Sequence, residues 1–147
     1  YGTAGGDYRL DVTTDMNHEL EPNGFDAIAD GYGTGSFSVE GALQNDTDED
    51  YYLLSLDSAS RVTIETRGVR LACEADTEIR LVDSDGETVL LEDDESGALN
   101  EVGLGGCSAL RPGDHDLLTS LAAGDYDIVV NGWGGRRGAY LLNVRAE

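Results

Sequence analysis

Two acidic segments in the first third of the chain carry the side chains best suited to chemistry. Residues 19–23 read Glu-Leu-Glu-Pro-Asn, and residues 45–50 read Asn-Asp-Thr-Asp-Glu-Asp, directly before an apolar run at 51–56. Carboxylates crowded together repel one another, so a fold that joins the two segments needs a cation between them. Oxygen ligands that include an amide suit a hard ion, calcium better than magnesium. We therefore expect calcium as the cofactor; the alternative is a solvated acidic linker followed by an Asp-rich turn.

A second group of carboxylates lies farther along the chain and is a candidate for a second ion. Its possible ligands are Asp76, Asp93 and Asp94. Residues 83–86 (Asp-Ser-Asp-Gly) begin like an EF-hand loop, but position 94 is Asp instead of the glutamate that such a loop needs, and the flanks read as strands. The alternative is that Asp85 and Gly86 form a turn and that Asp76 caps its own loop.

Residues that could support catalysis are sparse. No serine has a Gly-x-Ser-x-Gly setting, and His18 and His115 lie in unrelated segments without a matching nucleophile. Paired carboxylates could serve a glycosidase, but such sites lie in clefts lined by aromatic residues, and Trp133 is the only Trp. We expect no catalytic residues and no enzyme activity.

The composition and net charge of the chain limit the kinds of partner that it can bind. The 147 residues fit one domain of ordinary size, and nine basic against 30 acidic residues give a net charge of −21. All nine basic residues are Arg. Such a surface disfavours nucleic acid and anionic membranes, and no run approaches the roughly 20 apolar residues of a membrane span. The Gly-rich polar start lacks a signal-peptide pattern, so we expect a mature or excised chain.

The two cysteines, Cys73 and Cys107, allow one disulfide. Each lies at the edge of an expected loop, which fits a disulfide that links neighbouring loops. The alternative is a pair of unrelated buried thiols in a reducing compartment. Two Cys and two scattered His do not make a zinc site.

The apolar pattern predicts strands almost throughout. Period-two alternation or β-rich runs, separated by Gly, Asn and Asp clusters, occur at 8–12, 36–39, 51–56, 61–66, 77–82, 88–91, 116–121, 126–130 and 140–144. Residues 84–86 (Ser-Asp-Gly) indicate a hairpin turn. One short helical turn is expected at 26–30. The pattern predicts an all-β fold, an antiparallel β-sandwich.

Seven short elements in a fixed order resemble the bacterial pre-peptidase C-terminal domain, a group that includes the collagen-binding domains of clostridial collagenases. They lie at 19–23 (ELEPN), 41–43 with 48–52 (GAL, DEDYY), 76–81 (DTEIRL), 83–86 (DSDG), 93–94 (DD), 121–126 (LAAGDY) and 138–144 (GAYLLNV). The resemblance covers about residues 16–147. It implies a secreted, jelly-roll-like β-sandwich, commonly stabilised by calcium and appended to peptidases or repeated in surface proteins.

The resemblance also implies a set of metal ligands. The Glu-x-Glu-Pro-Asn element supplies Glu19, Glu21 and Asn23, and the aspartate before the aromatic strand is Asp50. Asp48, with Asp46 as a further candidate, would complete the shell. The acidic residue that can follow the Asn is Gly24 here, so either Asp26 substitutes for it or the site is weaker.

The two ends of the chain resemble each other. At an offset of 132, residues 6–12 (GDYRLDV) align with 138–144 (GAYLLNV), pairing Tyr8, Leu10 and Val12 with Tyr140, Leu142 and Val144. One sandwich needs only one closing strand. Residues 1–15 would then be an extra strand, either the remnant of a preceding repeat or a strand donated to a neighbour, unless strand composition alone produces the match.

From these observations we expect a secreted, extracellular or cell-surface module without catalytic activity. The main hypothesis is a structural unit of a filament or tandem-repeat surface protein, a homo-oligomer or an array joined by strand pairing. The alternative is an accessory C-terminal domain of a secreted peptidase or other hydrolase, for export or for binding an extracellular polymer such as a collagen-like substrate.

Overall fold

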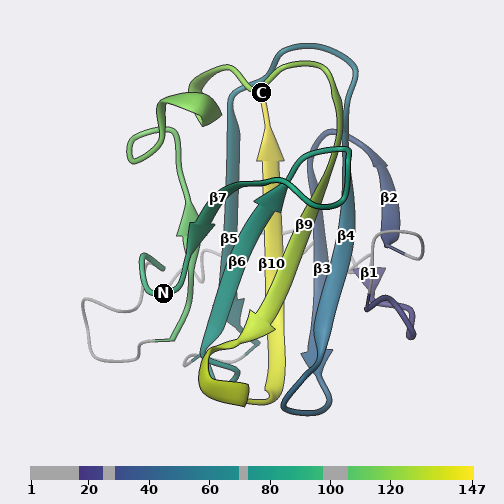
Figure 1. Cartoon of the computed structure of the whole chain (residues 1–147), viewed down its shortest axis with the longest axis vertical. Coiled ribbons are helices and arrows are strands. Elements are labelled where there is room, and N and C mark those ends of the chain that lie inside the picture. The colour runs from purple at the N-terminus through teal and green to yellow at the C-terminus, as the bar shows by residue number, and fades with distance from the viewer. Residues whose placement is uncertain (1–16, 25–28, 70–72, 98–105) are drawn as a thin grey trace, which may run out of the picture.

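Two five-stranded sheets pack face to face as a β-sandwich (Figure 1). The computed structural model describes residues 17–24, 29–69, 73–97 and 106–147. The first sheet has the order β1 (Asn17–His18), β3 (Phe37–Leu43), β10 (Gly138–Ala146), β5 (Val62–Gly68), β8 (Ala109–Leu110). The second has the order β2 (Asp30–Thr34), β4 (Glu49–Leu56), β9 (Gly124–Gly132), β6 (Thr77–Val82), β7 (Val89–Asp93).

Alternating side chains of the central strands form the core. In β4 every second residue is buried, and β3, β5 and β10 alternate in the same way because successive side chains of a strand point to opposite faces. Tyr52, Leu54, Ile64, Tyr140 and Leu142 are all fully buried between the sheets. Within the described ranges, no helix is long and apolar enough to cross a membrane.

The predicted all-β, jelly-roll-like sandwich is confirmed, with a difference at the sheet edges. The central pairs are antiparallel, but β1 pairs with β3 and β2 pairs with β4 in parallel. A hairpin forces its two strands to be antiparallel. Neither edge strand is joined to its neighbour by a hairpin, because β1, β2 and β3 alternate between the two sheets.

One predicted strand is wrong, and three short strands were not predicted. Residues 116–121 were expected to form a strand, but Asp116–Thr119 is the 3-10 helix η3. Leu118 and Leu121 are both buried at a helical spacing of three, whereas Leu117 is exposed. The unpredicted strands are β1, β2 and β8; two of them have only two residues, and β2 contains two glycines that indicate a turn.

Two further predictions concern residues that the structure does not describe, or describes only in part. The extra strand predicted at 8–12 lies entirely outside the described residues. Of the expected helical turn at 26–30, residues 26–28 also lie outside, and Asp30 begins β2.

The predicted hairpin at 84–86 is confirmed. It joins the antiparallel strands β6 and β7, and Gly86 has the positive φ of 70° that its turn requires. The Asp85 carboxylate accepts hydrogen bonds from the backbone of Glu87 and Thr88 and from the Thr88 hydroxyl, which lower its pKa. Asp85 is therefore a turn residue whose carboxylate oxygens are hydrogen-bonded within the turn.

The disulfide between Cys73 and Cys107 is present, with Cα atoms 5.3 Å apart. It links the segment before β6 to the segment before β8, and so connects the two sheets at one end of the sandwich. Beside it, Thr66 of β5 and Thr77 of β6 share a buried hydroxyl hydrogen bond at 2.5 Å. The bridge thus lies against a polar contact that also spans the sheets.

Candidate metal site

Three carboxylates from the two acidic segments converge. Glu19, Glu21 and Asp50 each offer an oxygen, and these oxygens lie within 4.8 Å of one another. Glu19 and Glu21 belong to the segment that passes from β1 in one sheet to β2 in the other, and Asp50 is the second residue of β4. The group is the one candidate metal cluster found in the described ranges of the chain.

Backbone hydrogen bonds fix the segment that carries the two glutamates. Glu19 donates its N–H to the carbonyl of Glu40, and Tyr51 donates to the carbonyl of Asn23 at 3.0 Å. The N–H of Leu20 donates to Asp30 Oδ2 at 2.7 Å. The segment is thereby attached to β3 at one end and to β4 at the other.

Glu19 reaches into the sandwich. Its Oε1 accepts the N–H of Ala42 at 2.5 Å, and its Oε2 accepts the hydroxyl of Tyr52 at 2.8 Å. Burial raises the pKa of Glu19 above its ordinary value, although these hydrogen bonds oppose the rise. The side chain is therefore oriented before any ion arrives.

Asp50 is the most deeply buried of the three carboxylates. Its residue is fully buried, and Tyr140 donates its hydroxyl to Asp50 Oδ2 at 2.5 Å. Burial, together with the charge of Glu19, raises the pKa of Asp50 to about 8. In the described part of the chain, no arginine forms an ion pair with Glu19, Glu21 or Asp50. A buried carboxylate in this setting holds a proton or requires a cation.

Asn23 distinguishes these two states. One position of its buried amide lies 3.2 Å from Asp50 Oδ1 and 3.1 Å from Glu21 Oε2. When the amide nitrogen occupies that position, it donates to both carboxylates. When the amide oxygen occupies it, three oxygens face one another, an arrangement that a cation between them stabilises. The donor set of carboxylate and amide oxygens fits calcium.

The remaining predicted ligands are less central. Asp48 Oδ2 accepts the N–H of Gln44 at 2.5 Å, and the Gln44 amide donates to Glu21 Oε1 at 2.7 Å, so Asp48 lies beside the cluster. Asp46 lies instead against the loop at Gly135. Asp26 lies outside the described residues.

Comparison with solved structures identifies the architecture. The chain is similar to the crystal structure of the pre-peptidase C-terminal domain of collagenase from Bacillus anthracis, with a TM-score of 0.56 and 16% sequence identity. The match covers 80% of this chain and 94% of that domain. The fold is that of a pre-peptidase C-terminal domain. No protein-family model and no curated protein matches the sequence. The resemblance carried by the seven sequence elements is thus confirmed at the level of the pre-peptidase C-terminal fold.

Sequence reasoning missed the two tyrosines that support the cluster within this pre-peptidase C-terminal fold. Tyr52 and Tyr140 were expected on strands, without a role at the metal site. Both point inward and are fully buried, and a buried tyrosine hydroxyl requires a hydrogen-bond partner. For Tyr52 the available signal was its inward position on a strand that begins with acidic residues; β10, which carries Tyr140, begins after Arg136 and Arg137 and gave no such signal.

The second set of carboxylates is engaged in other contacts. Asp76 Oδ2 pairs with Arg136 Nε at 3.0 Å. Asp93 Oδ2 accepts the N–H groups of Ser96 and Ala109 at 2.9 and 2.8 Å. Asp93 and Asp94 line a small cavity together with Trp133, but Asp76 does not. Within the described ranges, the three do not form a metal cluster, so a second ion there stays a prediction.

Proposed function

We propose that this chain is a calcium-stabilised accessory domain of a secreted protein, without catalytic activity of its own. One observation carries the calcium assignment: the buried Asp50 carboxylate faces Glu19, Glu21 and Asn23, with no basic partner among the described residues. The accessory role is supported by the likeness to a domain of a collagenase. The disulfide fits an oxidising compartment, as secretion requires.

Calcium would be held by Glu19, Glu21 and Asp50 and by the Asn23 side chain, with its amide oxygen turned toward the ion. It would supply the positive charge that neutralises the carboxylates. The ion would then join the segment between β1 and β2 to the start of β4. Since that segment begins at β1 in the first sheet and β4 belongs to the second, ion binding would stabilise the sandwich at this end.

Thermal unfolding with and without calcium tests this proposal. An ion that binds only the folded state at a hundredfold excess over its Kd adds about 2.7 kcal/mol. In a domain of this size that raises the Tm by about 5–10 °C. Asp50→Asn should abolish most of the calcium effect, while Asp57→Asn, an exposed residue directly after β4, should retain it. Equal melting curves in calcium and in EDTA would contradict the calcium assignment.

A second candidate function, assembly through the N-terminal segment, is favoured by the closing strand. In β10, Tyr140, Leu142 and Val144 are all buried in the core. Residues 8, 10 and 12 are the same three types, Tyr, Leu and Val. A segment with this pattern suits the same place in another copy of the domain, in a filament or in a tandem array.

Deleting residues 1–15 tests the assembly hypothesis. The truncated chain should keep its β-sheet spectrum and its calcium-dependent Tm but remain a monomer in sedimentation experiments. If the full chain is equally monomeric at all concentrations, pairing between separate subunits is excluded. The accessory role does not depend on this result.

A further inference from the structure

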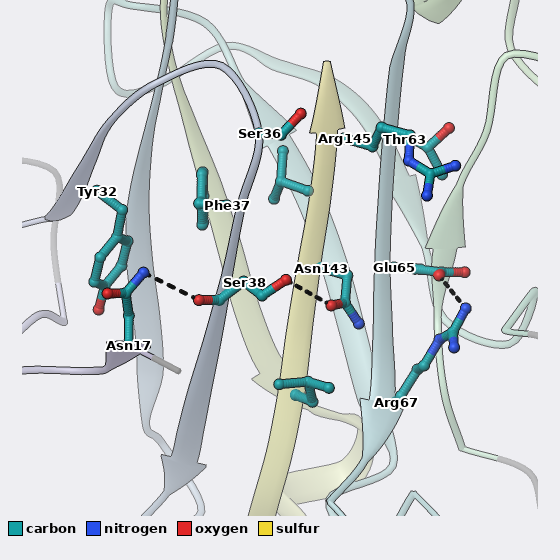
Figure 2. Close-up of a pocket in the computed structure, with 12 residues that line it drawn as sticks. Asn17, Tyr32, Ser36, Phe37, Ser38, Thr63, Glu65, Arg67, Asn143 and Arg145 are labelled. Atoms are coloured by element: carbon teal, nitrogen blue, oxygen red, sulfur yellow. Dashed lines mark hydrogen bonds and ion pairs between the residues drawn. The ribbon is translucent and has the colours of Figure 1, made fainter. Parts of the chain in front are cut away.

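The outer face of the first sheet carries an open groove of about 770 Å³. It runs over β3, β10 and β5, whose outward side chains form its floor (Figure 2). Three central strands at a spacing of about 4.8 Å give a floor about 10 Å wide. That width accommodates one extended polymer chain.

The charge of the groove differs from that of the chain. Its lining contains Arg67 and Arg145 but only one acidic residue, Glu65. The whole chain carries −21. The side chains of Arg67 and Arg145 are 54% and 75% exposed, so both guanidinium groups are accessible. An anionic ligand repelled by most of this surface meets a net positive lining here.

In the groove, side-chain acceptors already receive hydrogen bonds from neighbouring residues, whereas some side-chain donors remain available to a ligand. Asn143 Oδ1 accepts the Ser38 hydroxyl at 2.8 Å, and Glu65 accepts Arg67 at 2.5 Å. In contrast, Asn143 Nδ2 has no partner among the described residues, and Figure 2 shows it turned away from Ser38. Among the described residues, the Arg145 guanidinium forms one ion pair, with Glu147 at 3.9 Å. The available donors suit a ligand rich in oxygen acceptors.

The same face is poorly suited to two other kinds of ligand. Backbone groups of β3, β10 and β5 are used in pairing with neighbouring strands, so an extended peptide has no open edge to join in the groove. Neutral sugars commonly stack on exposed aromatic rings, but Phe37 is buried and the Tyr32 ring packs against it, with the ring centroids 5.4 Å apart. Recognition here therefore depends on charge and hydrogen bonds.

We propose that this groove binds an acidic polysaccharide, with uronate carboxylates placed at Arg145 and at Asn143 Nδ2. This inference rests on the accessory role proposed above and names the class of polymer that the domain would hold. The calcium site lies in other residues, so glycan binding and calcium-dependent stability can be measured separately.

Titration with hyaluronan oligosaccharides, which carry glucuronate, tests the proposal. The full chain is used in calcium at about 0.15 M salt, where the Debye length of about 8 Å screens distant acidic residues. Chitin oligosaccharides serve as the neutral glycan and poly-glutamate as the acidic polypeptide. We expect binding of hyaluronan that weakens with added salt, and no comparable binding of the other two.

Two variants and one control localise the site. Arg145→Gln should weaken hyaluronan binding about tenfold, the value of one charge-assisted hydrogen bond. Asn143→Asp keeps the acceptor for Ser38, replaces the free donor with a carboxylate and should weaken binding at least as much. Arg137→Gln makes the same charge change at an exposed residue outside the groove and should bind normally.

Several results would overturn the proposal. These are absence of hyaluronan binding, equal binding of the neutral glycan or of poly-glutamate, and equal losses in Arg145→Gln and Arg137→Gln. A calcium-dependent Tm that persists in the same samples would show that the accessory domain is intact and that only the ligand assignment has failed.

Discussion

The hydroxyl oxygens of Tyr52 and Tyr140 lie 2.6 Å apart in the interior of the sandwich. Tyr52 belongs to β4 in one sheet and Tyr140 to β10 in the other. Each hydroxyl also contacts one carboxylate of the cluster, Glu19 for Tyr52 and Asp50 for Tyr140. The hydrophobic core and the acidic cluster are therefore joined by a single hydrogen-bonded chain that spans both sheets.

Tyr140→Phe should destabilise the protein. The substitution leaves the ring in place but removes the hydrogen bond to the buried Asp50, and losing one partner of a buried polar group costs about 1–3 kcal/mol. Chemical denaturation measures the change in unfolding free energy. Tyr51→Phe is the control, because the Tyr51 hydroxyl makes only a 3.5 Å contact with Glu49 on the outer face. A Tyr140→Phe protein as stable as Tyr51→Phe would argue against this role.

Gly41→Ala should disturb the same tyrosine pair. A Cβ at Gly41 would lie 2.5 Å from Tyr140 Cζ and 2.5 Å from the Tyr52 hydroxyl oxygen, closer than real contacts allow. Overpacking of this kind costs about 1–3 kcal/mol. At Gly113 an added Cβ meets nothing within 4 Å, so Gly113→Ala should leave the Tm almost unchanged. Equal Tm values for the two variants would show that the tyrosines can move at little cost.

The stability of the calcium-free protein should fall as the pH rises from about 4 to about 8. Burial raises the pKa of Asp50 from 3.8 to about 8, so in this range the folded state holds a proton that the unfolded chain has released. Folding that takes up a proton becomes less favourable as the pH increases. Calcium favours the ionised form, and its stabilising effect should grow over the same range.

Asp50→Asn separates this effect from the titration of the other acidic residues. The variant should show a flatter dependence of unfolding free energy on pH between 4 and 8 in EDTA. An unchanged pH dependence would mean that the proton taken up on folding is bound elsewhere.

Reduction of the Cys73–Cys107 bridge should lower the Tm. The bridge closes a loop with a sequence separation of 34 residues, which corresponds to about 3–4 kcal/mol in the chain-entropy model. Melting in the presence and absence of reductant, with the double Cys→Ser variant as a reductant-insensitive control, measures the loss. A wild-type Tm that does not respond to complete reduction would show that the bridge contributes little.

Sequence alone could predict much of the fold because the central strands alternate clearly. Runs such as 77–82 identify their strand, since each second residue enters the core. The pattern failed at 116–121, where a short apolar run was interpreted as a strand although the buried residues, Leu118 and Leu121, are three positions apart, a spacing that places side chains on opposite faces of a strand. It also missed β2, because pairing with β4 supports a strand that its glycines disfavour.

The carboxylates of the candidate metal site could be predicted from the sequence, but the tyrosines that support them could not. Glu19 and Glu21 lie in one conspicuous acidic segment and Asp50 ends another, and the structure brings the three together with Asn23. The supporting tyrosines were not predictable as a pair, since Tyr52 and Tyr140 are separated by 88 residues. Only the packing of the two sheets places their hydroxyls in contact.

The central claim is that this domain binds calcium at the acidic cluster. The most direct test is calorimetric titration of the chelator-treated protein with calcium. We predict saturable binding at the site formed by Glu19, Glu21, Asn23 and Asp50, with release of protons near neutral pH, and loss of that binding in Asp50→Asn but not in Asp57→Asn. Absence of saturable calcium binding, or equal binding by Asp50→Asn, would contradict the account.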